Sequence, residues 1–272
     1  MTAALAGKVA VVTGSSRGIG RGAAIALAEQ GATVYVTGRT TTGPLSIGES
    51  ARLVDEAGGH GIAVEVDHGD DTQVGALFAQ VAAEQGHLDI LVNNVYKIPD
   101  PPAWGGGFWD HPISIWDDQV GIGMRAHYVA SWHAAPLLFV AGPGGFICNV
   151  SSPGGQSYHF SSSYGAGKAG LDRLTADMAV ELEPKGVATV ALYPGSVATE
   201  FIREWSVKRG TDLSGSQTTL GVGRTIAALA TLPFADLMAR SGTIQWCEDV
   251  SVELDVRDEH GNLLPAYAKR VR

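Results

Sequence analysis

The sequence predicts an α/β fold, in which helices cover both faces of a parallel sheet of about seven strands. Short runs of β-branched and apolar residues alternate along the chain with longer segments of helical periodicity. The strand segments are almost continuously apolar, as expected for strands buried on both faces. The 272 residues show no repeat, low-complexity segment or domain boundary, so we expect a single domain over 1–272.

Four strands and three helices are expected in the first part of the chain. Val, Ile, Leu and Thr dominate the four segments that we predict as strands, namely 8–14, 33–38, 61–67 and 88–94. Apolar residues recur with helical spacing over 19–32, around 48–57 and over 71–86. Gly31 ends the first of these helices, and Asp70 or Asp71 is expected to cap the third.

The second part continues the alternation. Helices are predicted over 114–141, over 163–186 and over 219–233, and strands at 144–152, 187–195 and 242–254. Two segments break the rhythm: 97–113 is rich in Pro, Gly and Trp, and 200–217 is polar with scattered aromatic residues. Both follow the carboxyl ends of strands, where open α/β sheets bind ligands, so we expect them to form a substrate pocket and its lid.

Composition excludes several classes of function. The formal net charge of −9 disfavours nucleic acid and anionic membranes as partners. Cys148 and Cys247 form no Cys-x-x-Cys motif, and the N-terminus lacks the positive region of a secretory signal, so we expect a cytoplasmic protein. The apolar runs are too short to span a membrane, and the eight histidines form no metal-binding motif.

A glycine-rich turn joins the first predicted strand to the first helix and reads Thr-Gly-Ser-Ser-Arg-Gly-Ile-Gly over 13–20. Gly14 permits the tight turn, Gly18 lets the backbone approach a pyrophosphate, and Gly20 lets helix and strand pack closely. The helix N-terminus then presents free N–H groups to the phosphates. Such a turn can be merely structural, but its place in the first strand–helix connection favours a dinucleotide site.

The end of the second strand indicates which dinucleotide is bound. NAD-binding proteins commonly carry an acidic residue here, because a carboxylate accepts the hydrogen bonds of the ribose 2′-OH. This sequence has Arg39 instead, and Arg17 in the glycine turn is a second guanidinium able to hold a 2′-phosphate. Two solvated surface arginines are the alternative. We therefore expect NADP(H) to be preferred, with NAD(H) possible.

Tyr164 and Lys168 are four residues apart, so they share one face of the predicted helix. A fixed ammonium favours phenolate and would lower the pKa of Tyr164 from its usual value of about 10, making the phenol a general acid and base. Taken alone, the pair is more typical of a surface tyrosine that packs on a lysine stem.

Taken in order, these motifs resemble the classical short-chain dehydrogenase/reductase family over about residues 7–200. The matching features are the glycine turn, Asn93-Asn94, Ser151-Ser152, Tyr164 with Lys168, and Pro194-Gly195. The resemblance implies one Rossmann-type domain, a homodimer or homotetramer, and a catalytic set of Ser152, Tyr164 and Lys168. The expected cofactor-binding residues are Gly14, Ser16, Arg17, Gly18, Ile19, Gly20, Arg39, Asp67, His68, Asn94, Val95, Tyr164, Lys168, Pro194, Gly195, Val197 and Thr199.

The resemblance also implies a division of roles. Tyr164 would donate or accept the proton, while Lys168 would lower its pKa and hold the nicotinamide ribose. A serine would hydrogen-bond the carbonyl oxygen of the substrate. Ser152 matches the second serine of the family pattern, and Ser151 is the alternative.

Two features depart from the family pattern. The long helix usually carries an asparagine of a proton relay, and Gly123 stands at that position, as in one carbonyl reductase branch that this chain resembles. We hypothesise that ordered water fills the space beside Gly123. The alternative is that Gly123 only lets the helix pass close to a neighbour. The usual ending with Val-Asp-Gly-Gly is also absent.

The sequence thus predicts an NADP(H)-dependent oxidoreductase that interconverts a carbonyl compound and an alcohol, with a small molecule as its partner. Aromatic residues near the two irregular segments suggest a bulky apolar ketone, aldehyde or quinone. A non-catalytic NADP(H) sensor and an imine or enoyl reductase are the alternatives. The aromatic residues are Trp104, Phe108, Trp109, Tyr158, Phe160, Phe201 and Trp205.

Overall fold

The computed structural model describes residues 3–100, 102 and 105–268. Its strands form one seven-stranded parallel sheet in the order β3-β2-β1-β4-β5-β6-β7, which confirms the predicted fold class. The strands are β1 (Val9–Val12), β2 (Thr33–Gly38), β3 (His60–Glu65), β4 (Ile90–Asn93), β5 (Gly145–Val150), β6 (Val187–Tyr193) and β7 (Ile244–Trp246).

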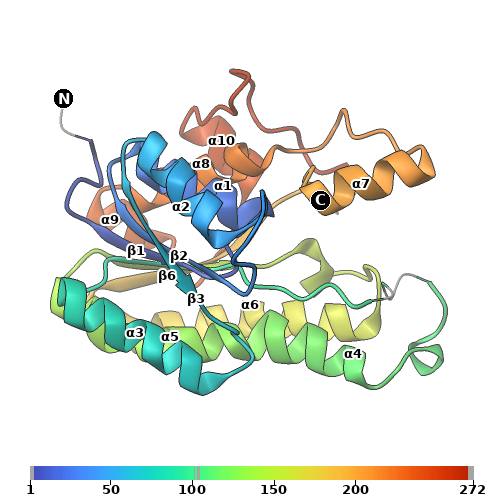
Figure 1. Ribbon diagram of the computed structural model, residues 1–272, viewed down its shortest axis with the longest axis horizontal. Coiled ribbons are helices and arrows are strands. Elements are labelled where there is room, and N and C mark those ends of the chain that lie inside the picture. Colours follow the sequence, from blue (N-terminus) through green and yellow to red (C-terminus); the bar gives the residue numbers. More distant parts are fainter. Residues whose placement is uncertain (1–2, 101, 103–104, 269–272) are drawn as a thin grey trace.

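Helices cover the sheet in two layers (Figure 1). One layer contains α1 (Gly18–Glu29), α2 (Ile47–Glu56), α8 (Thr219–Ala230), α9 (Phe234–Ala239) and α10 (Cys247–Glu253). The other contains α3 (Asp71–Gln85), α5 (Ala126–Ala141) and α6 (Ser162–Leu182).

Each strand serves both layers because its side chains alternate between the two faces of the sheet. In β1, Ala10 and Val12 pack in the core beneath α1 and α8, while Val9 and Val11 pack in the core beneath α3 and α5. The near-continuous apolar strands of the sequence therefore correspond to two hydrophobic cores, one on each face.

Glycines bring α1 and α8 into close contact. A Cβ atom on Gly22 would lie 2.0 Å from the carbonyl oxygen of Thr219, and one on Gly223 would lie 2.1 Å from that of Gly22. Both distances are impossible for real atoms, so only glycine fits at this crossing. The crossing holds the helix of the glycine turn firmly against its neighbour.

We expect Gly22→Ala to lower the free energy of unfolding by about 1–3 kcal/mol, because the added methyl group would force the two helix backbones apart. Chemical denaturation followed by circular dichroism measures the change. Gly48→Ala is the matched control: a Cβ on this helical glycine meets only the Ser46 hydroxyl at 3.9 Å, and alanine favours helix. Equal stabilities of the two variants would contradict the steric argument.

One predicted element was wrong, and another is helical as predicted but irregular. The stretch 242–254 forms only the short strand β7 and then α10, because Cys247, Val250 and Ser251 are buried at the helical spacing of three and four residues. The predicted helix 114–141 is not regular: α4 (Ser114–Trp116) leads into a π-helix over Asp117–Arg125, and α5 follows. The segment after β6 contains α7 (Glu200–Arg209), for which no helix had been predicted.

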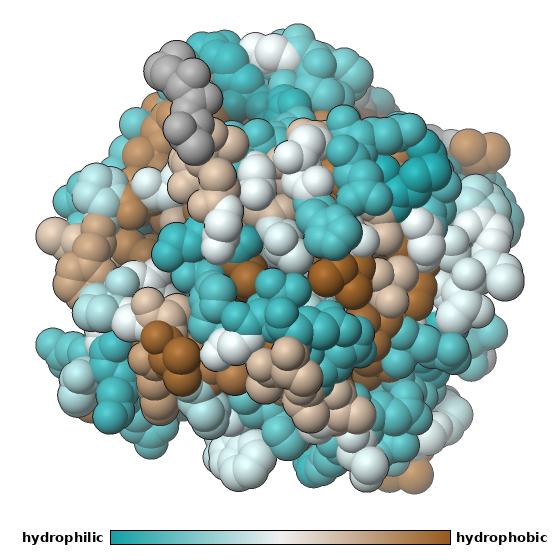
Figure 2. All heavy atoms as spheres, turned by 60° about the vertical axis from the view of Figure 1, so that its left-hand side comes forward, coloured by the Kyte–Doolittle hydropathy of each residue, from teal (hydrophilic) through white to brown (hydrophobic). Residues whose placement is uncertain are grey.

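Polar and apolar residues share the surface of the described part of the chain. On the face seen in Figure 2, hydrophilic residues cover most of the area, and apolar residues form small separate groups. Among the described residues, no helix has the length and apolar character needed to cross a bilayer.

Candidate active site

The predicted site residues gather at the carboxyl edge of the sheet, where the strand order reverses between β1 and β4. This reversal opens a crevice, because the chain leaves the two strands in opposite directions. The glycine turn follows β1, Arg39 follows β2, and Asp67 and His68 follow β3. The segment from Asn94 follows β4 on the other side of the crevice.

The glycine turn has the conformation that its sequence predicts. Gly14 and Gly18 have φ values of 65° and 59°, which side chains rarely adopt. A Cβ on Gly20 would lie 2.5 Å from the Gly14 carbonyl oxygen, so this glycine allows the close packing. The Gly18 N–H donates a hydrogen bond to the Glu200 carboxylate at 2.9 Å. The N-terminus of α1 therefore accommodates an anionic group, and the turn fits a pyrophosphate.

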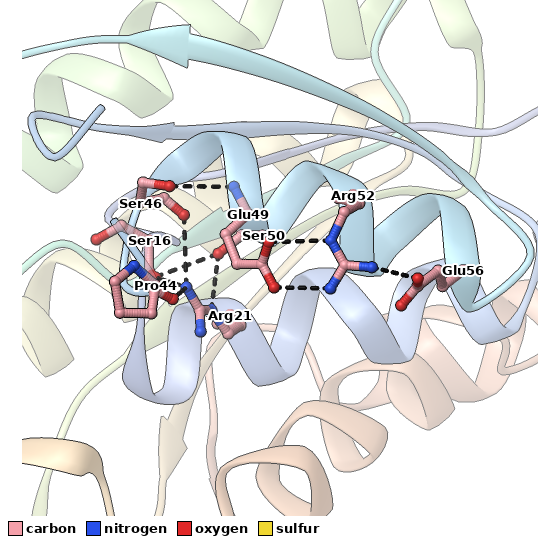
Figure 3. A network of polar contacts seen from close by, with 8 residues as sticks. All are labelled: Ser16, Arg21, Pro44, Ser46, Glu49, Ser50, Arg52 and Glu56. Carbon is pink, nitrogen blue, oxygen red and sulfur yellow. Dashed lines mark hydrogen bonds and ion pairs between the residues drawn. The ribbon is translucent and has the colours of Figure 1, made fainter. Parts of the chain in front are cut away.

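Arg21 fixes the loop that follows β2, a role that the sequence did not reveal. Its guanidinium donates to the Ser50 hydroxyl at 2.8 Å and to the carbonyl oxygens of Ser16, Pro44 and Ser46 (Figure 3). These bonds tie the glycine turn to the loop between β2 and α2. The loop that carries Arg39 is thereby held beside the turn.

The two arginines expected to bind a 2′-phosphate lie on the same side of the crevice. Arg17 donates to the Thr40 hydroxyl at 3.1 Å, and Arg39 lies 3.6 Å from the Asp67 carboxylate. Both guanidinium groups are exposed to solvent, and Arg39 has 64% of its side chain accessible. An exposed guanidinium with one weakly held partner has donors left for an incoming phosphate.

His68 differs from its predicted surroundings in being buried, with 4% of its surface accessible. Its Nε2 lies 2.8 Å from the hydroxyl of Thr37, whose proton is directed to the Val12 carbonyl oxygen. Nε2 therefore carries the proton, and Nδ1 is an acceptor with no partner among the described residues. Burial lowers the pKa of His68 to about 4, so the ring is neutral at pH 7.

Asn94 holds the loops of β1 and β4 together. Its side-chain amide donates to the carbonyl oxygens of Thr13 and Gly14 at 2.9 and 3.0 Å. The backbone N–H groups of Asn94 and Val95 both donate to the Thr13 hydroxyl. The amide donors of Asn94 are thus engaged within the protein, and the residue shapes the crevice.

Tyr164, Lys168 and Ser152 come together at the ends of α6 and β5. The Ser152 side chain and the Tyr164 ring both lie beside Gly154, and the Ser152 hydroxyl accepts the Gly154 N–H at 3.1 Å. Ser151 is turned away, because its buried hydroxyl donates to the Asp172 carboxylate at 2.6 Å. Of the two candidate serines, the structure brings only Ser152 to the phenol.

The expected lowering of the Tyr164 pKa was wrong for this arrangement. Burial raises the pKa of Tyr164 to about 12, and the hydrogen bond from Ser152 only partly opposes this. Burial lowers the pKa of Lys168 to about 8, against the effect of the Asp172 carboxylate. The Lys168 ammonium donates to the Val150 carbonyl oxygen at 2.9 Å. Removal from water is the largest cause of each shift, so Tyr164 is a protonated donor at pH 7.

The space beside Gly123 is taken by an aromatic ring. A Cβ on Gly123 would lie 3.2 Å from the Tyr96 ring, closer than ordinary van der Waals contact. The structure therefore favours the alternative in which Gly123 makes room for a neighbour. An asparagine side chain at this position would require Tyr96 to move, so the hypothesis of a water-filled space is revised.

A cavity of about 200 Å³ adjoins Tyr164. Phe160 links the two, because its ring lies edge-to-face on that of Tyr164 with 5.2 Å between centroids. Phe160 has a strained φ of 57° in a tight turn that Ser161 closes by donating to the His159 carbonyl oxygen. The lining residues are Gly106, Gly107, Phe108, Trp109, His111, Tyr158, Phe160, Ser161 and Ser162.

The two irregular segments contribute unequally to this cavity. Residues 106–109 and His111 line it, but Phe201 and Trp205 of α7 stack on each other outside its described lining. Trp104 lies outside the described residues. Tyr267 was not predicted: it lies 2.7 Å from His159 and stacks on Trp246. No motif marks Tyr267, since it comes from the ending that departs from the family pattern.

The segment after β6 contacts the glycine turn at the carboxyl edge of the sheet. The Gly195 N–H donates to the Gln217 side chain, and Val197 pairs with Gln217 in a short bridge. The hydroxyl of Thr199 caps α7 at the Ile202 N–H, and its methyl group lies beside Gly18. In the described part of the chain, no cluster of His, Cys, Asp and Glu is arranged to bind a metal ion.

Comparison with known proteins places this geometry in a family. The model of the short chain dehydrogenases matches residues 8–210. The mouse protein named Dehydrogenase/reductase SDR family member 1 is 39% identical over 98% of this chain and 88% of its own length. Cis-4-hydroxycyclohexanecarboxylate dehydrogenase of Sinomonas cyclohexanicum is 36% identical over 74% of this chain and 78% of its own. A short-chain dehydrogenase/reductase structure from Serratia marcescens has a TM-score of 0.76 at 28% identity, covering 89% of this chain and 96% of that one. The chain therefore belongs to the short-chain dehydrogenase/reductase family and is an NAD(P)-dependent oxidoreductase that acts on alcohol and carbonyl groups.

Proposed function

We propose that the protein is an NADP(H)-dependent carbonyl reductase and alcohol dehydrogenase for a bulky apolar ketone, aldehyde or quinone. The observation that carries the proposal is the meeting of Ser152, Tyr164 and Lys168 beside an aromatic cavity. A cytoplasmic homodimer or homotetramer is part of the same proposal.

In this proposal Tyr164 transfers the proton. The phenol is protonated at pH 7 and can donate to a carbonyl oxygen that becomes an alkoxide. Ser152 lies beside the phenol ring, so its hydroxyl can bind the same oxygen and stabilise the developing charge. A bound nicotinamide cofactor would supply or accept the hydride. In alcohol oxidation the proton moves in the opposite direction.

Lys168 would act in two places. Its ammonium stabilises the phenolate that remains after proton transfer, because the opposite charge becomes most favourable when both groups are buried. It would also bind the hydroxyls of the nicotinamide ribose. The helical spacing of Tyr164 and Lys168 keeps the two groups on the same face of α6 throughout.

The residues around the glycine turn fit a dinucleotide. The turn itself would bind the pyrophosphate, and the acceptor Nδ1 of His68 suits the adenine side of the crevice. No carboxylate follows β2 directly, whereas Arg39 and Arg17 present guanidinium groups there. This charge pattern supports NADP(H) over NAD(H).

We expect Arg39→Ala to weaken NADPH binding about ten- to a hundred-fold, which is the worth of one charge-assisted contact to phosphate. NADH lacks the 2′-phosphate, so its affinity should stay within about twofold. Titration of nucleotide fluorescence measures both affinities. The control is Arg52→Ala, since Arg52 is exposed on α2 but is bound to Glu49 and Glu56 (Figure 3). Equal losses for both cofactors would assign Arg39 a structural role instead.

A panel of ketones, aldehydes and quinones, followed by loss of NADPH absorbance with NADH alongside, tests the function. Turnover that grows with the apolar bulk of the substrate would support the proposal. Tight NADPH binding without turnover of any member would favour the non-catalytic sensor. Turnover of imines or enoyl compounds alone would point to a different reductase on the same scaffold.

A further inference from the structure

Tyr96 takes no part in the predicted site, yet its ring lies at the centre of it. It follows Val95 in the loop after β4 and packs on Gly123 of the π-helix. Its ring also lies edge-to-face with that of Tyr164, with centroids 5.9 Å apart and planes at 85°. One side chain therefore contacts both the π-helix and the proposed proton donor.

The ring of Tyr96 also faces the ammonium of Lys168. The Lys168 Nζ lies over this ring at 5.4 Å from its centroid and over the Tyr164 ring at 6.0 Å. Only 6% of the Lys168 surface is accessible, so the ammonium has little water to stabilise its charge. In a desolvated site an aromatic face is a substantial source of stabilisation for a cation.

Few other charged groups act on Lys168. From α6, the Asp172 carboxylate favours the ammonium, but it is already bound by Ser151 and Tyr193. From α5, His127 is buried, and burial lowers its pKa to about 3, so it carries no charge at pH 7. The Val150 carbonyl of β5 accepts one hydrogen bond. The Tyr96 ring is thus one of four groups that favour the ammonium, beside the Tyr164 ring, the Val150 carbonyl and the Asp172 carboxylate.

Hydrogen bonds through Gln119 connect the Tyr96 hydroxyl to the start of α6. This hydroxyl accepts the Gln119 amide at 3.4 Å, and the Gln119 carbonyl oxygen accepts the hydroxyls of Ser161 and Ser163. Ser161 in turn caps α6 at the Tyr164 N–H. Gln119 is 3% accessible, so this chain of bonds is sheltered from water. It fixes the ring plane relative to the helix that carries Tyr164 and Lys168.

We propose that Tyr96 is a positioning residue of the active site, whose ring face holds the Lys168 ammonium against Tyr164 and whose hydroxyl orients that ring. The inference rests on the proposed roles of Tyr164 and Lys168. Gly123 contributes to the same arrangement, because a side chain at this position would displace the Tyr96 ring. The ring, and not the hydroxyl, stabilises the charge of Lys168.

The test measures Lys168 directly. In protein labelled with ¹³C at the lysine ε-carbons, the Lys168 resonance is assigned by its loss in Lys168→Met, and its pKa is read from a pH titration. We expect Tyr96→Leu to lower this pKa by about half a unit to one and a half units, because the charged form loses the aromatic face. Tyr96→Phe keeps the face and should titrate like the wild type. Tyr128→Leu removes an exposed tyrosine of α5 and is the control.

A role that is only structural predicts a different pattern. Tyr96→Leu would then lower the melting temperature while Lys168 titrates as in the wild type, which would overturn the proposal. Where Tyr96→Leu fails to fold, phenylalanines with one, two or three ring fluorines at position 96 replace it, since they weaken the π face at nearly constant volume. A stepwise fall of the Lys168 pKa with fluorine number supports the proposal, and an unchanged pKa overturns it.

Kinetics separate this inference from the proposed function. In an active enzyme, the pH above which the reduction rate falls should move down with the Lys168 pKa in Tyr96→Leu and remain in place in Tyr96→Phe. The lysine titration needs no turnover, so it decides on Tyr96 even if every carbonyl substrate fails. Conversely, turnover with an unmoved lysine pKa would retain the function and reject the role of Tyr96.

Discussion

Tyr164→Phe is expected to reduce carbonyl reduction by about 10²- to 10⁴-fold, the usual contribution of a positioned acid or base. The variant loses only the phenol oxygen, which carries the proton in the proposed reaction. NADPH affinity should remain nearly intact, because the glycine turn and the arginines provide most of it. Initial rates and fluorescence titration measure the two effects separately.

Tyr128→Phe is the matched control for this variant, since Tyr128 is half exposed on α5 and takes no part in the proposed site. Its rate should equal that of the wild type. If Tyr164→Phe kept more than about a tenth of the wild-type rate, proton transfer would have to be assigned to another group.

Lys168→Met should lose both activity and cofactor affinity, because one ammonium serves the phenolate and the ribose. We expect the rate to fall about a hundredfold and NADPH affinity about tenfold, as for the loss of a hydrogen bond to a charged group. Methionine retains an apolar stem of similar length, so the buried site stays filled. Lys185→Ala, at the end of the turn after α6, is the control and should leave both quantities unchanged.

The pH dependence of the wild type tests the same residue. Burial lowers the pKa of Lys168 from 10.5 to about 8, so the ammonium is present below that pH and is lost as the pH rises through it. Tyr164 stays protonated over this range because its pKa is raised to about 12. The reduction rate should therefore fall above pH 8 in the wild type and be low and flat in Lys168→Met. If the wild-type rate instead rose through pH 8, the pH dependence would have to be assigned to a group other than Lys168.

The order of strands and helices could be predicted from local pattern alone. Buried parallel strands are almost continuously apolar, and apolar residues recur every three to four positions in the helices that cover them. Most elements can therefore be recognised from the sequence. The glycine turn is equally local, because positive φ values at Gly14 and Gly18 require glycine. The helix α7 and the stretch 242–254 were the exceptions. The latter was predicted as one strand, but its second half forms α10, which packs against α8.

The state of the active site depended on contacts between distant segments. The sequence brings Tyr164 and Lys168 to one helix face, but burial of that face raises the pKa of one and lowers that of the other. The choice between Ser151 and Ser152 followed from Asp172, which binds the first and leaves the second to the phenol.

The contact between Tyr96 and Gly123 could not be predicted, since the two residues are 27 positions apart and no local pattern indicates that they touch. The sequence by itself, through its local patterns and motifs, determined the fold class, the dinucleotide turn and the family. Only the tertiary structure decided how the charges of the site are balanced, because electrostatic energies depend on burial and on neighbours that the chain brings together only when it folds.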